Sequence, residues 1–279
     1  MSATESSNLE GKQALLNQRL EGFSALAVAF SGGADSTLLL RVARDRLGAD
    51  RVLAVTAVSP FFTKAEDRHC RELAALLGVR QERIEIDLLG FAKIVANDSR
   101  RCYHCKKVIL GQLQKRAADR GYVLLAEGSN RDDLDDYRPG RQAVAELAVI
   151  SPLLEAGLTK SEIRRFSHQL GLPTADRPAS ACLATRLPYG VALTREALAA
   201  VEACEGFLQR HGFENCRVRH HGTTARIELA AADPSTLFRD PLRRDLVAHC
   251  RQAGFLHVAL DLEGLRSGSL NEELPQPPF

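Results

Sequence analysis

The chain has 279 residues, of which 45% are hydrophobic and 26% are charged, and its formal net charge is +2. This composition is typical of a globular, soluble protein and excludes a largely disordered chain. The net charge is too small to indicate a nucleic-acid-binding surface, and no apolar run approaches the length needed to span a membrane.

The number and spacing of the cysteines indicate the cellular compartment of the protein. There are seven of them, an odd number, scattered along a chain whose first residues carry neither the basic region nor the apolar core of a signal peptide. A disulfide framework would need an even, compact set. We therefore expect reduced thiols and a cytoplasmic protein.

A strand, a glycine-rich loop and a helix follow one another early in the chain. The apolar run 24–30 predicts a buried strand, and helical spacing of apolar residues over 36–47 predicts a helix that stops at Gly48. The loop between them reads Ser-Gly-Gly-Ala-Asp-Ser. Its glycines allow the backbone to approach a ligand, and the free N–H groups of the helix start attract an anion, most often phosphate.

This loop lacks the Gly-Lys-Ser/Thr of a Walker A motif and resembles the pyrophosphate loop (PP-loop) of ATP pyrophosphatases, which cleave ATP to AMP and pyrophosphate to activate a carbonyl oxygen. On this interpretation the Ser31 and Ser36 hydroxyls and the loop amides hold the phosphates of ATP. Asp35 acts through Mg²⁺, since a bare carboxylate would repel the ligand. The residues so assigned are Ser31, Gly32, Gly33, Asp35 and Ser36. An ordinary strand-turn-helix is the alternative, but it needs neither two serines nor an aspartate.

Strands and helices continue to alternate after the loop. Apolar runs predict strands over 52–58, 83–87, 122–126 and 148–150, and helices are predicted over 63–78, 106–121 and 159–171. Capping boxes at Thr63–Glu66 and Thr159–Glu162 begin two of these helices. The pattern predicts an α/β fold with a doubly wound parallel sheet and a site at the carboxyl ends of its strands. Ser59, just after the second strand, is expected near the adenosine.

Two polar loops are expected at the same edge of the sheet. Residues 127–133 directly follow the fourth strand, and residues 136–140 come shortly afterwards. A solvated loop is the common explanation for such acidic runs. The position beside the phosphate loop favours a ligand role for some of these residues, and we assign Glu127 and Asn130 to nucleotide binding.

The cysteines fall into two classes. Cys70, Cys204, Cys216 and Cys250 have apolar neighbours and are expected to be buried. The Cys102–Cys105 pair is compatible with zinc, with a redox couple or with no function, and zinc would need a further ligand such as His104. Cys182 lies in a loop bounded by proline and glycine with two arginines nearby, which would favour its thiolate. Three cysteines without a fourth suit an iron–sulfur cluster with one open iron.

The pattern changes after about residue 190. Helices over 194–210 and 234–252 and short strands over 216–222, 225–229 and 256–260 predict a small α+β unit, followed by a Pro-rich tail expected to be disordered. We therefore expect two domains, 1–190 and 191–279. Arg217 and Arg219 alternate along one strand and share a face. Solvated surface arginines are the alternative.

Seven motifs, taken together and in order, resemble those of the LarE-type ATP-dependent sulfur transferases over nearly the whole chain. They are the PP-loop, Arg-Cys-Tyr-His-Cys-Lys-Lys, Glu-Gly-Ser-Asn, Asp-Tyr-Arg-Pro-Gly-Arg, Cys-Leu-Ala-Thr-Arg-Leu-Pro-Tyr-Gly, Arg-Val-Arg-His-His-Gly and Leu-Arg-Ser-Gly-Ser-Leu-Asn. The resemblance implies that the enzyme adenylates the carboxylates of pyridinium biscarboxylic acid mononucleotide and replaces an oxygen with sulfur. The product serves the nickel-pincer cofactor of lactate racemase.

The resemblance also implies residue roles. Cys182 matches the sulfur-supplying cysteine and Arg186 a nearby functional arginine, while Arg217 and Arg219 match substrate phosphate binders. Glu205 and Glu228 match metal- or substrate-associated carboxylates. Members that sacrifice a single cysteine lack the Cys-x-x-Cys pair, so this chain resembles the branch in which Cys102, Cys105 and Cys182 hold a [4Fe-4S] cluster. Sacrificial donation of sulfur from Cys182 is the alternative.

The expected ligands are ATP, Mg²⁺, the cluster and the small pyridinium mononucleotide. The sulfur donor is not identified, neither membrane nor nucleic acid is expected as a partner, and we expect a homo-oligomer. Two other functions fit the loop. A tRNA thiolation enzyme would need a basic RNA surface, which the mild net charge does not provide. A non-catalytic nucleotide sensor would bind ATP without producing AMP.

Overall fold

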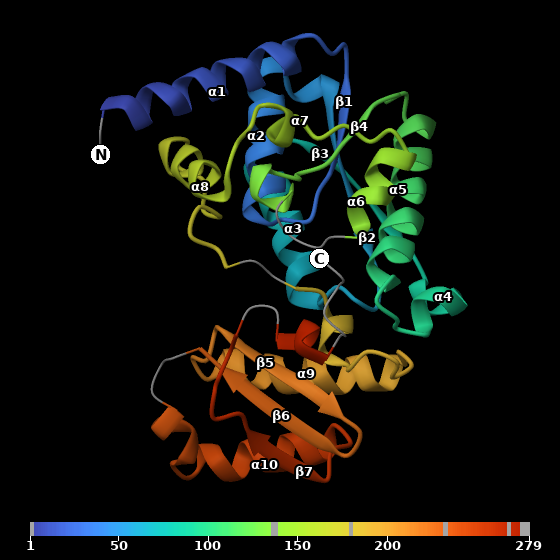
Figure 1. The fold of residues 1–279 in the computed structure, drawn as a ribbon, viewed down its shortest axis with the longest axis vertical. Helices are drawn as coiled ribbons and strands as arrows, with labels where there is room; N and C mark the ends of the chain where they lie inside the picture. Colours follow the sequence, from blue (N-terminus) through green and yellow to red (C-terminus); the bar gives the residue numbers. More distant parts are fainter. Residues whose placement is uncertain (1–2, 135–138, 179–180, 231–233, 267–268, 274–279) are drawn as a thin grey trace. The chain divides into compact units, whose positions relative to one another are not determined.

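The structure is a computed structural model that describes residues 3–134, 139–178, 181–230, 234–266 and 269–273 (Figure 1). The chain divides into two compact units. The first unit joins the chain up to Ile86 with the segment from Cys102 to residue 180. The second unit joins Asp87–Arg101 with the chain from Ala181 onward.

The first unit is built on a parallel sheet with the strand order β3-β2-β1-β4. Every pairing in this sheet is parallel, with Val28 of β1 opposite Ala54 of β2 on one side and Ala126 of β4 on the other. The central strands are buried apolar runs without alternation, as a sheet covered on both faces requires. The strands are β1 (Leu26–Ala29), β2 (Val52–Val58), β3 (Arg80–Glu85) and β4 (Leu125–Ala126). The predicted α/β fold with a parallel sheet is confirmed.

Helices lie on both sides of this sheet (Figure 1). The helix α2 packs against β1 and β2, and α1, α7 and α8 pack on α2 as an outer layer. Figure 1 shows α5 and α6 on the side of the sheet away from α2. The helices of this unit are α1 (Ala3–Glu21), α2 (Ala34–Leu47), α3 (Lys64–Leu76), α5 (Arg101–Asp119), α6 (Gly140–Glu146), α7 (Pro152–Glu155) and α8 (Lys160–Gln169), with short 3₁₀ turns η1 (Ala49–Arg51) and η3 (Arg131–Leu134).

Local sequence explains where several helices begin and end. Both capping boxes are confirmed, because the Thr63 and Thr159 side chains accept bonds from the amides three residues on, and glutamates return bonds to the threonine amides. Helix α2 ends at Gly48, whose φ of +88° is a conformation that glycine adopts without strain. These signals act over a few residues, so sequence alone reveals them.

The structure differs from several of these predictions. Helix α5 begins at Arg101 instead of Lys106, so the cysteine pair lies on its first turns. The strand expected over 148–150 is a single parallel bridge from Ile150 to Ala126, because Ala148 turns the chain with a φ of +51°. The helix expected over 234–252 divides into a 3₁₀ turn and α10. Helix α1 was not predicted, although it buries Leu9, Leu16 and Leu20 against the core.

The second unit contains a three-stranded sheet of order β5-β6-β7 with α9 packed against β5 and α10 against α9 and β7. Strands β5 and β6 are antiparallel, and β6 and β7 are parallel. The strands expected here are confirmed. The elements are η2 (Leu88–Gly90), α4 (Ala92–Val95), η4 (Leu183–Arg186), α9 (Arg195–Arg210), β5 (Cys216–His221), β6 (Thr224–Leu229), η5 (Pro234–Phe238), α10 (Leu242–Gln252), β7 (His257–Leu260) and η6 (Ser269–Glu273).

Alternation gives this small sheet one apolar and one polar face. Val218 and Ile227 face each other across β5 and β6 and are fully buried. On the other face Arg217 lies opposite Glu228, and Arg219 lies opposite Arg226. One face of this sheet thus carries charged residues, of which Arg219 and Glu228 are buried.

Some of the predicted segments fall wholly or partly outside the residues that the structure describes. Of the loop 136–140, the structure describes only Pro139 and Gly140, and the Pro-rich tail from residue 274 lies outside the described residues. The division of roles between residues 1–190 and 191–279 stays a prediction. Within the described ranges, none of the helices has the length and apolar character needed to cross a membrane.

Candidate functional site

The PP-loop in the first unit connects the carboxyl end of β1 to the N-terminus of α2. The hydroxyls of Ser31 and Ser36 lie 3.2 Å apart, and the Ser36 hydroxyl also contacts the Gly33 carbonyl at 3.3 Å. Gly32 has a φ of +68°, and a Cβ added there would lie 2.8 Å from the Cys70 sulfur on α3. A side chain at Gly32 is therefore excluded by both backbone conformation and space.

The loop after β4 packs directly on the PP-loop. A Cβ added at Gly128 would lie 3.1 Å from the Ser36 amide nitrogen and 3.2 Å from the Asp35 Cβ. The buried Asn130 donates a hydrogen bond from Nδ2 to the Asp35 carboxylate at 3.3 Å. The structure therefore brings Asp35, Ser36 and Asn130 together at the carboxyl edge of two adjacent strands.

Glu127 lies at the same edge and is almost fully buried. Its carboxylate accepts hydrogen bonds from the Ser151 hydroxyl at 2.7 Å and the Ser129 amide at 3.0 Å, and it forms an ion pair with Lys106 at 2.9 Å. Burial by itself would raise the pKa of Glu127, but Lys106 and the two serines outweigh it and hold the pKa below its usual value. Glu127 is thus a charged carboxylate, anchored to helix α5.

Ser59 follows β2, the neighbour of β1 in the sheet. Its hydroxyl accepts a hydrogen bond from the Phe61 amide at 3.3 Å, and its carbonyl accepts one from the Phe62 amide at 3.0 Å. Ser59 therefore shapes the turn after β2 at the edge that carries the PP-loop. A role toward adenosine stays a prediction.

The seven cysteines divide as expected. Cys70, Cys204, Cys216 and Cys250 are buried, and burial raises the pKa of Cys70 and of Cys216 to about 12. Cys102 is exposed, Cys105 is partly exposed, and Cys182 is exposed. The accessible thiols are therefore the three that the sequence singled out.

Cys102 and Cys105 are three residues apart on α5 and so point to the same side of the helix. They belong to the first unit, whereas Cys182 belongs to the second. Among the residues that the structure describes, no group of three or more His, Cys, Asp or Glu side chains is arranged to hold a metal ion. A role of the three cysteines as metal ligands stays a prediction.

Cys182 precedes the short η4 turn in the second unit, and Arg186 closes that turn. The Cys182 carbonyl accepts a hydrogen bond from the Thr185 amide at 3.0 Å. Nη1 of Arg186 donates to the Ala181 carbonyl at 2.9 Å and contacts the Cys182 carbonyl at 3.4 Å. Arg186 thus fixes the backbone that presents the Cys182 thiol.

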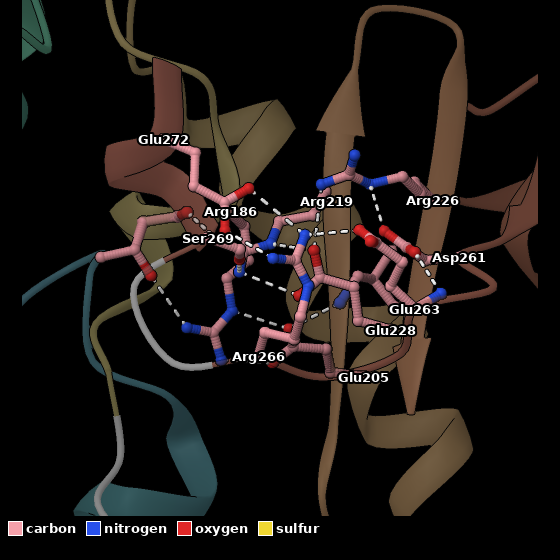
Figure 2. A network of polar contacts seen from close by, with 12 residues as sticks. Arg186, Glu205, Arg219, Arg226, Glu228, Asp261, Glu263, Arg266, Ser269 and Glu272 are labelled. Carbon is pink, nitrogen blue, oxygen red and sulfur yellow. Dashed lines mark hydrogen bonds and ion pairs between the residues drawn. The ribbon is translucent and has the colours of Figure 1, made fainter. Parts of the chain in front are cut away.

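Arg186 is itself held by a buried carboxylate. Its Nε and Nη2 donate to the two oxygens of Glu205 at 2.7 and 3.1 Å, and Glu205 also accepts the Val218 amide at 2.9 Å (Figure 2). This one carboxylate joins α9, the η4 turn and strand β5. Such two-point pairing is among the strongest hydrogen-bonded ion pairs in proteins.

A second buried pair lies on the polar face of the sheet. Nε and Nη2 of Arg219 donate to the two oxygens of Glu228, both at 2.9 Å, and Arg226 adds a third bond at 3.0 Å (Figure 2). Arg219 also donates to the Thr185 carbonyl at 2.7 Å and to the Ser269 hydroxyl at 2.9 Å. In this structure the carboxylates of Glu205 and Glu228 form ion pairs with arginines. Their assignment to a metal stays a prediction.

Arg217 differs from these arginines. It is partly exposed, and within the described part of the chain its side chain forms no hydrogen bond or ion pair. Burial, together with the nearby guanidinium groups of Arg186 and Arg219, lowers the pKa of Arg217. Arg217 is repelled by two neighbouring cations, and a bound anion would offset this repulsion. The position therefore favours an anionic ligand.

A small pocket opens to solvent on the same polar face. It is lined by Arg186, Pro188, Arg219, His221, Arg226, Ser269 and Leu270. Three arginines and a serine hydroxyl give it the donors that bind phosphate.

Comparison with known proteins places this geometry in a family. Residues 12–130 match the NAD synthase family. The chain is 38% identical to the pyridinium-3,5-bisthiocarboxylic acid mononucleotide synthase of Lactiplantibacillus plantarum, over 95% of this chain and 96% of that protein. The chain belongs to the LarE-type ATP-dependent sulfur transferases. An uncharacterised protein of Synechocystis is 41% identical over 95% of this chain and 99% of its own length.

A more distant relative matches about half of this chain. Argininosuccinate synthase of Haloarcula marismortui is 29% identical over 55% of this chain and 39% of that protein. The LarE-type member described here is thus an ATP-dependent sulfurtransferase with an ATP pyrophosphatase fold. Its individual site residues are still predictions, because the comparisons name no residues.

Several residues that hold the site together were not predicted. Lys106 directly follows Cys105 and lies four residues after Cys102, a spacing that a helix beginning at Arg101 would have revealed. Ser151 gave no local signal, because its partner Glu127 lies 24 residues earlier in the chain. Arg226 lies two residues before its partner Glu228 on β6, so alternation along that strand would have placed the two on one face.

The contact of Gly128 with the PP-loop gives a first test. Gly128→Ala should raise the KM for ATP about tenfold or more, because the added methyl group would overlap the Ser36 amide and displace the loop. Gly111→Ala is the matched control, since nothing lies within 4 Å of its Cβ position and alanine favours the α5 helix. Steady-state pyrophosphate release measures both. Equal KM values for the two variants would contradict the close approach.

Proposed function

We propose that this LarE-type enzyme uses ATP to adenylate a carboxylate of pyridinium-3,5-biscarboxylic acid mononucleotide and then replaces the activated oxygen with sulfur. The substrate assignment rests on one observation. The chain is similar, over nearly the whole length of both proteins, to a synthase of the bisthiocarboxylic form of this mononucleotide. A carboxylate resists nucleophiles because oxide is a poor leaving group. Attachment of AMP supplies a good one.

The first unit contributes the ATP half of this proposal. The loop amides and the hydroxyls of Ser31 and Ser36 bind the phosphates at the start of α2, where free N–H groups and the helix dipole favour negative charge. Asp35 offers carboxylate oxygens of the kind that Mg²⁺ prefers, oriented by Asn130. Mg²⁺, when bound, neutralises charge on the phosphates as pyrophosphate leaves.

The second unit contributes the substrate phosphate site. Arg217 has a guanidinium without a carboxylate partner among the described residues, and Arg219 is fixed in place by Glu228. A phosphate bound by Arg217 would meet a preorganised cationic surface. The same unit carries Cys182, so the residues proposed to bind the substrate and the thiol proposed to serve the transfer belong to one compact unit.

We further propose that Cys102, Cys105 and Cys182 hold a [4Fe-4S] cluster. The donor set fits the group, since these are the three accessible thiols and the other four cysteines are buried. A cluster with three protein thiolates would supply sulfide that is replaced between turnovers. Arg186 would keep the Cys182 backbone in place, and Cys182 would remain intact, so one enzyme molecule could turn over many times. The alternative, sacrifice of the Cys182 sulfur, predicts a damaged Cys182 after one turnover.

The tRNA thiolation alternative has less support. Two of the relatives, including an argininosuccinate synthase, act on small molecules by name, and a more distant one is a tRNA(Ile)-lysidine synthase that matches 54% of this chain. The net charge of +2 offers little attraction for an RNA backbone. We also propose a homo-oligomer in the cytoplasm, where thiols stay reduced.

The contrast between Arg217 and Arg219 tests the phosphate site. Arg217→Ala should raise the substrate KM about ten- to a hundredfold, because one charge-assisted bond to phosphate is lost, and should leave the free energy of unfolding nearly unchanged. Arg219→Ala should lower stability by about 3–5 kcal/mol, because it leaves Glu228 without its main partner. Steady-state kinetics and chemical denaturation measure the two effects.

Arg217→Lys is the matched control for charge. It should recover part of the substrate affinity, since lysine keeps the cation but lacks the fork geometry. An Arg217→Ala enzyme whose KM rises equally for ATP and substrate would argue against phosphate binding by Arg217.

Serine substitutions at the three cysteines test the sulfur source. Cys102→Ser, Cys105→Ser and Cys182→Ser should each lose iron after anaerobic reconstitution and lose sulfur insertion, because three ligands act together. Cys70→Ser is the control, because Cys70 is not one of the three proposed cluster ligands, and this variant should keep its iron. Sacrificial donation predicts instead that Cys102→Ser stays active and that spent enzyme shows Cys182 short by the mass of hydrogen sulfide. That pair of results would overturn the cluster.

A further inference from the structure

The turn that carries Cys182 is held by the segment Asp87–Arg101, which belongs to the same unit. Asn97 in this segment is fully buried and has a φ of +54°. Its Nδ2 donates to the Pro188 carbonyl at 2.8 Å and the Val191 carbonyl at 3.0 Å, and its own carbonyl accepts the Gly190 amide at 3.0 Å. One side chain and one carbonyl thus close the loop that follows η4.

Arg101 holds the other end of this loop. It is only 2% exposed, which is rare for an arginine without a structural purpose. Its Nη1 donates to the Ala184 carbonyl at 3.1 Å and to the Asn97 side-chain oxygen, and its guanidinium lies 5.7 Å from the centre of the Tyr189 ring. Arg101 and Asn97 therefore form one connected clamp.

The clamp acts together with Arg186. Arg186 bonds the carbonyl of Ala181 and approaches that of Cys182, Arg101 bonds Ala184, and Asn97 bonds the backbone at 188–191. The backbone is thus held before, within and after the η4 turn. Buried donors of this kind are costly to leave unsatisfied, so the turn has one favoured conformation.

We propose that Asn97 and Arg101 are positioning residues for the Cys182 thiol, which they keep in the orientation needed for sulfur transfer. The inference rests on the proposed participation of Cys182 in that transfer. Small displacements of a reacting group cost large factors in rate, whereas ATP binding depends on the PP-loop of the other unit. Loss of the clamp should therefore lower kcat and leave the KM for ATP unchanged.

Arg101 also directly precedes Cys102 in the chain. The same guanidinium that bonds the Cys182 turn is thus carried by the first residue of helix α5, on which Cys102 and Cys105 lie.

Two substitutions test the clamp in the full-length protein without added ligand. Asn97→Gly keeps the positive φ but removes the amide, and Arg101→Lys keeps the charge but removes the guanidinium geometry. Arg100→Lys, at an exposed neighbouring position, is the control. Hydrogen exchange should become about tenfold faster at the amides of residues 185–191 in both variants, because each loses at least one buried hydrogen bond. Exchange in β5 and β6 should not change.

Kinetics provide the second readout. Sulfur insertion should fall about tenfold in kcat, with the KM for ATP within about twofold of the parent enzyme. Unchanged exchange at residues 185–191, or faster exchange with an undiminished kcat, would overturn the proposal. If Asn97→Gly does not fold, Arg101→Lys decides alone. An active Cys182→Ser enzyme would refute the proposed function of Cys182, whereas the exchange result depends only on the clamp.

Discussion

The buried bond between Arg186 and Glu205 is the interaction on which the second unit depends. Glu205 joins α9, strand β5 and the turn that carries Cys182 through one carboxylate. Two desolvated charges are stable only when their hydrogen bonds are satisfied, and here the remaining donors of Arg186 reach the backbone around Cys182. Arg217 lies beside the guanidinium groups of Arg186 and Arg219, and its side chain has no ion-pair partner among the described residues.

The first unit obeys a different constraint, which is the close approach of two loops. Gly32 lies against α3 and Gly128 lies against Ser36, so the PP-loop is confined on both sides by positions where no side chain fits. The ion pair between the buried Glu127 and the partly exposed Lys106 then connects this nucleotide edge to the helix that carries Cys102 and Cys105. Phosphate binding and the cysteine helix therefore share one rigid framework.

Much of the fold could be read from the sequence because its signals are local. Apolar runs marked the parallel strands, and Thr63 and Thr159 marked helix starts through contacts three residues away. The PP-loop stood out for the same reason. The start of α5 at Arg101 and the grouping of residues 87–101 with the chain after Ala181 depend on contacts about ninety residues apart, such as that of Asn97 with Pro188, and left no local pattern.

The site was predicted in part for similar reasons. Alternation along β5 correctly placed Arg217 and Arg219 on one face, but it could not tell that Glu228 would pair with Arg219 and Arg226. Exposure separated the cysteines as expected, since burial follows the apolar pattern around each one. The roles of Glu205 and Glu228 could not be read from the sequence, because a carboxylate in a motif does not reveal whether its partner is a metal or an arginine.

The central claim is that a carboxylate oxygen of the substrate leaves on AMP and is replaced by sulfur. The most direct test uses pyridinium biscarboxylic acid mononucleotide labelled with oxygen-18 in its carboxylates, incubated with ATP, Mg²⁺ and the anaerobically reconstituted enzyme. Mass spectrometry of the AMP should show one labelled oxygen for each sulfur gained by the substrate. Unlabelled AMP beside a thiocarboxylate product, or AMP formation without the substrate, would contradict the account.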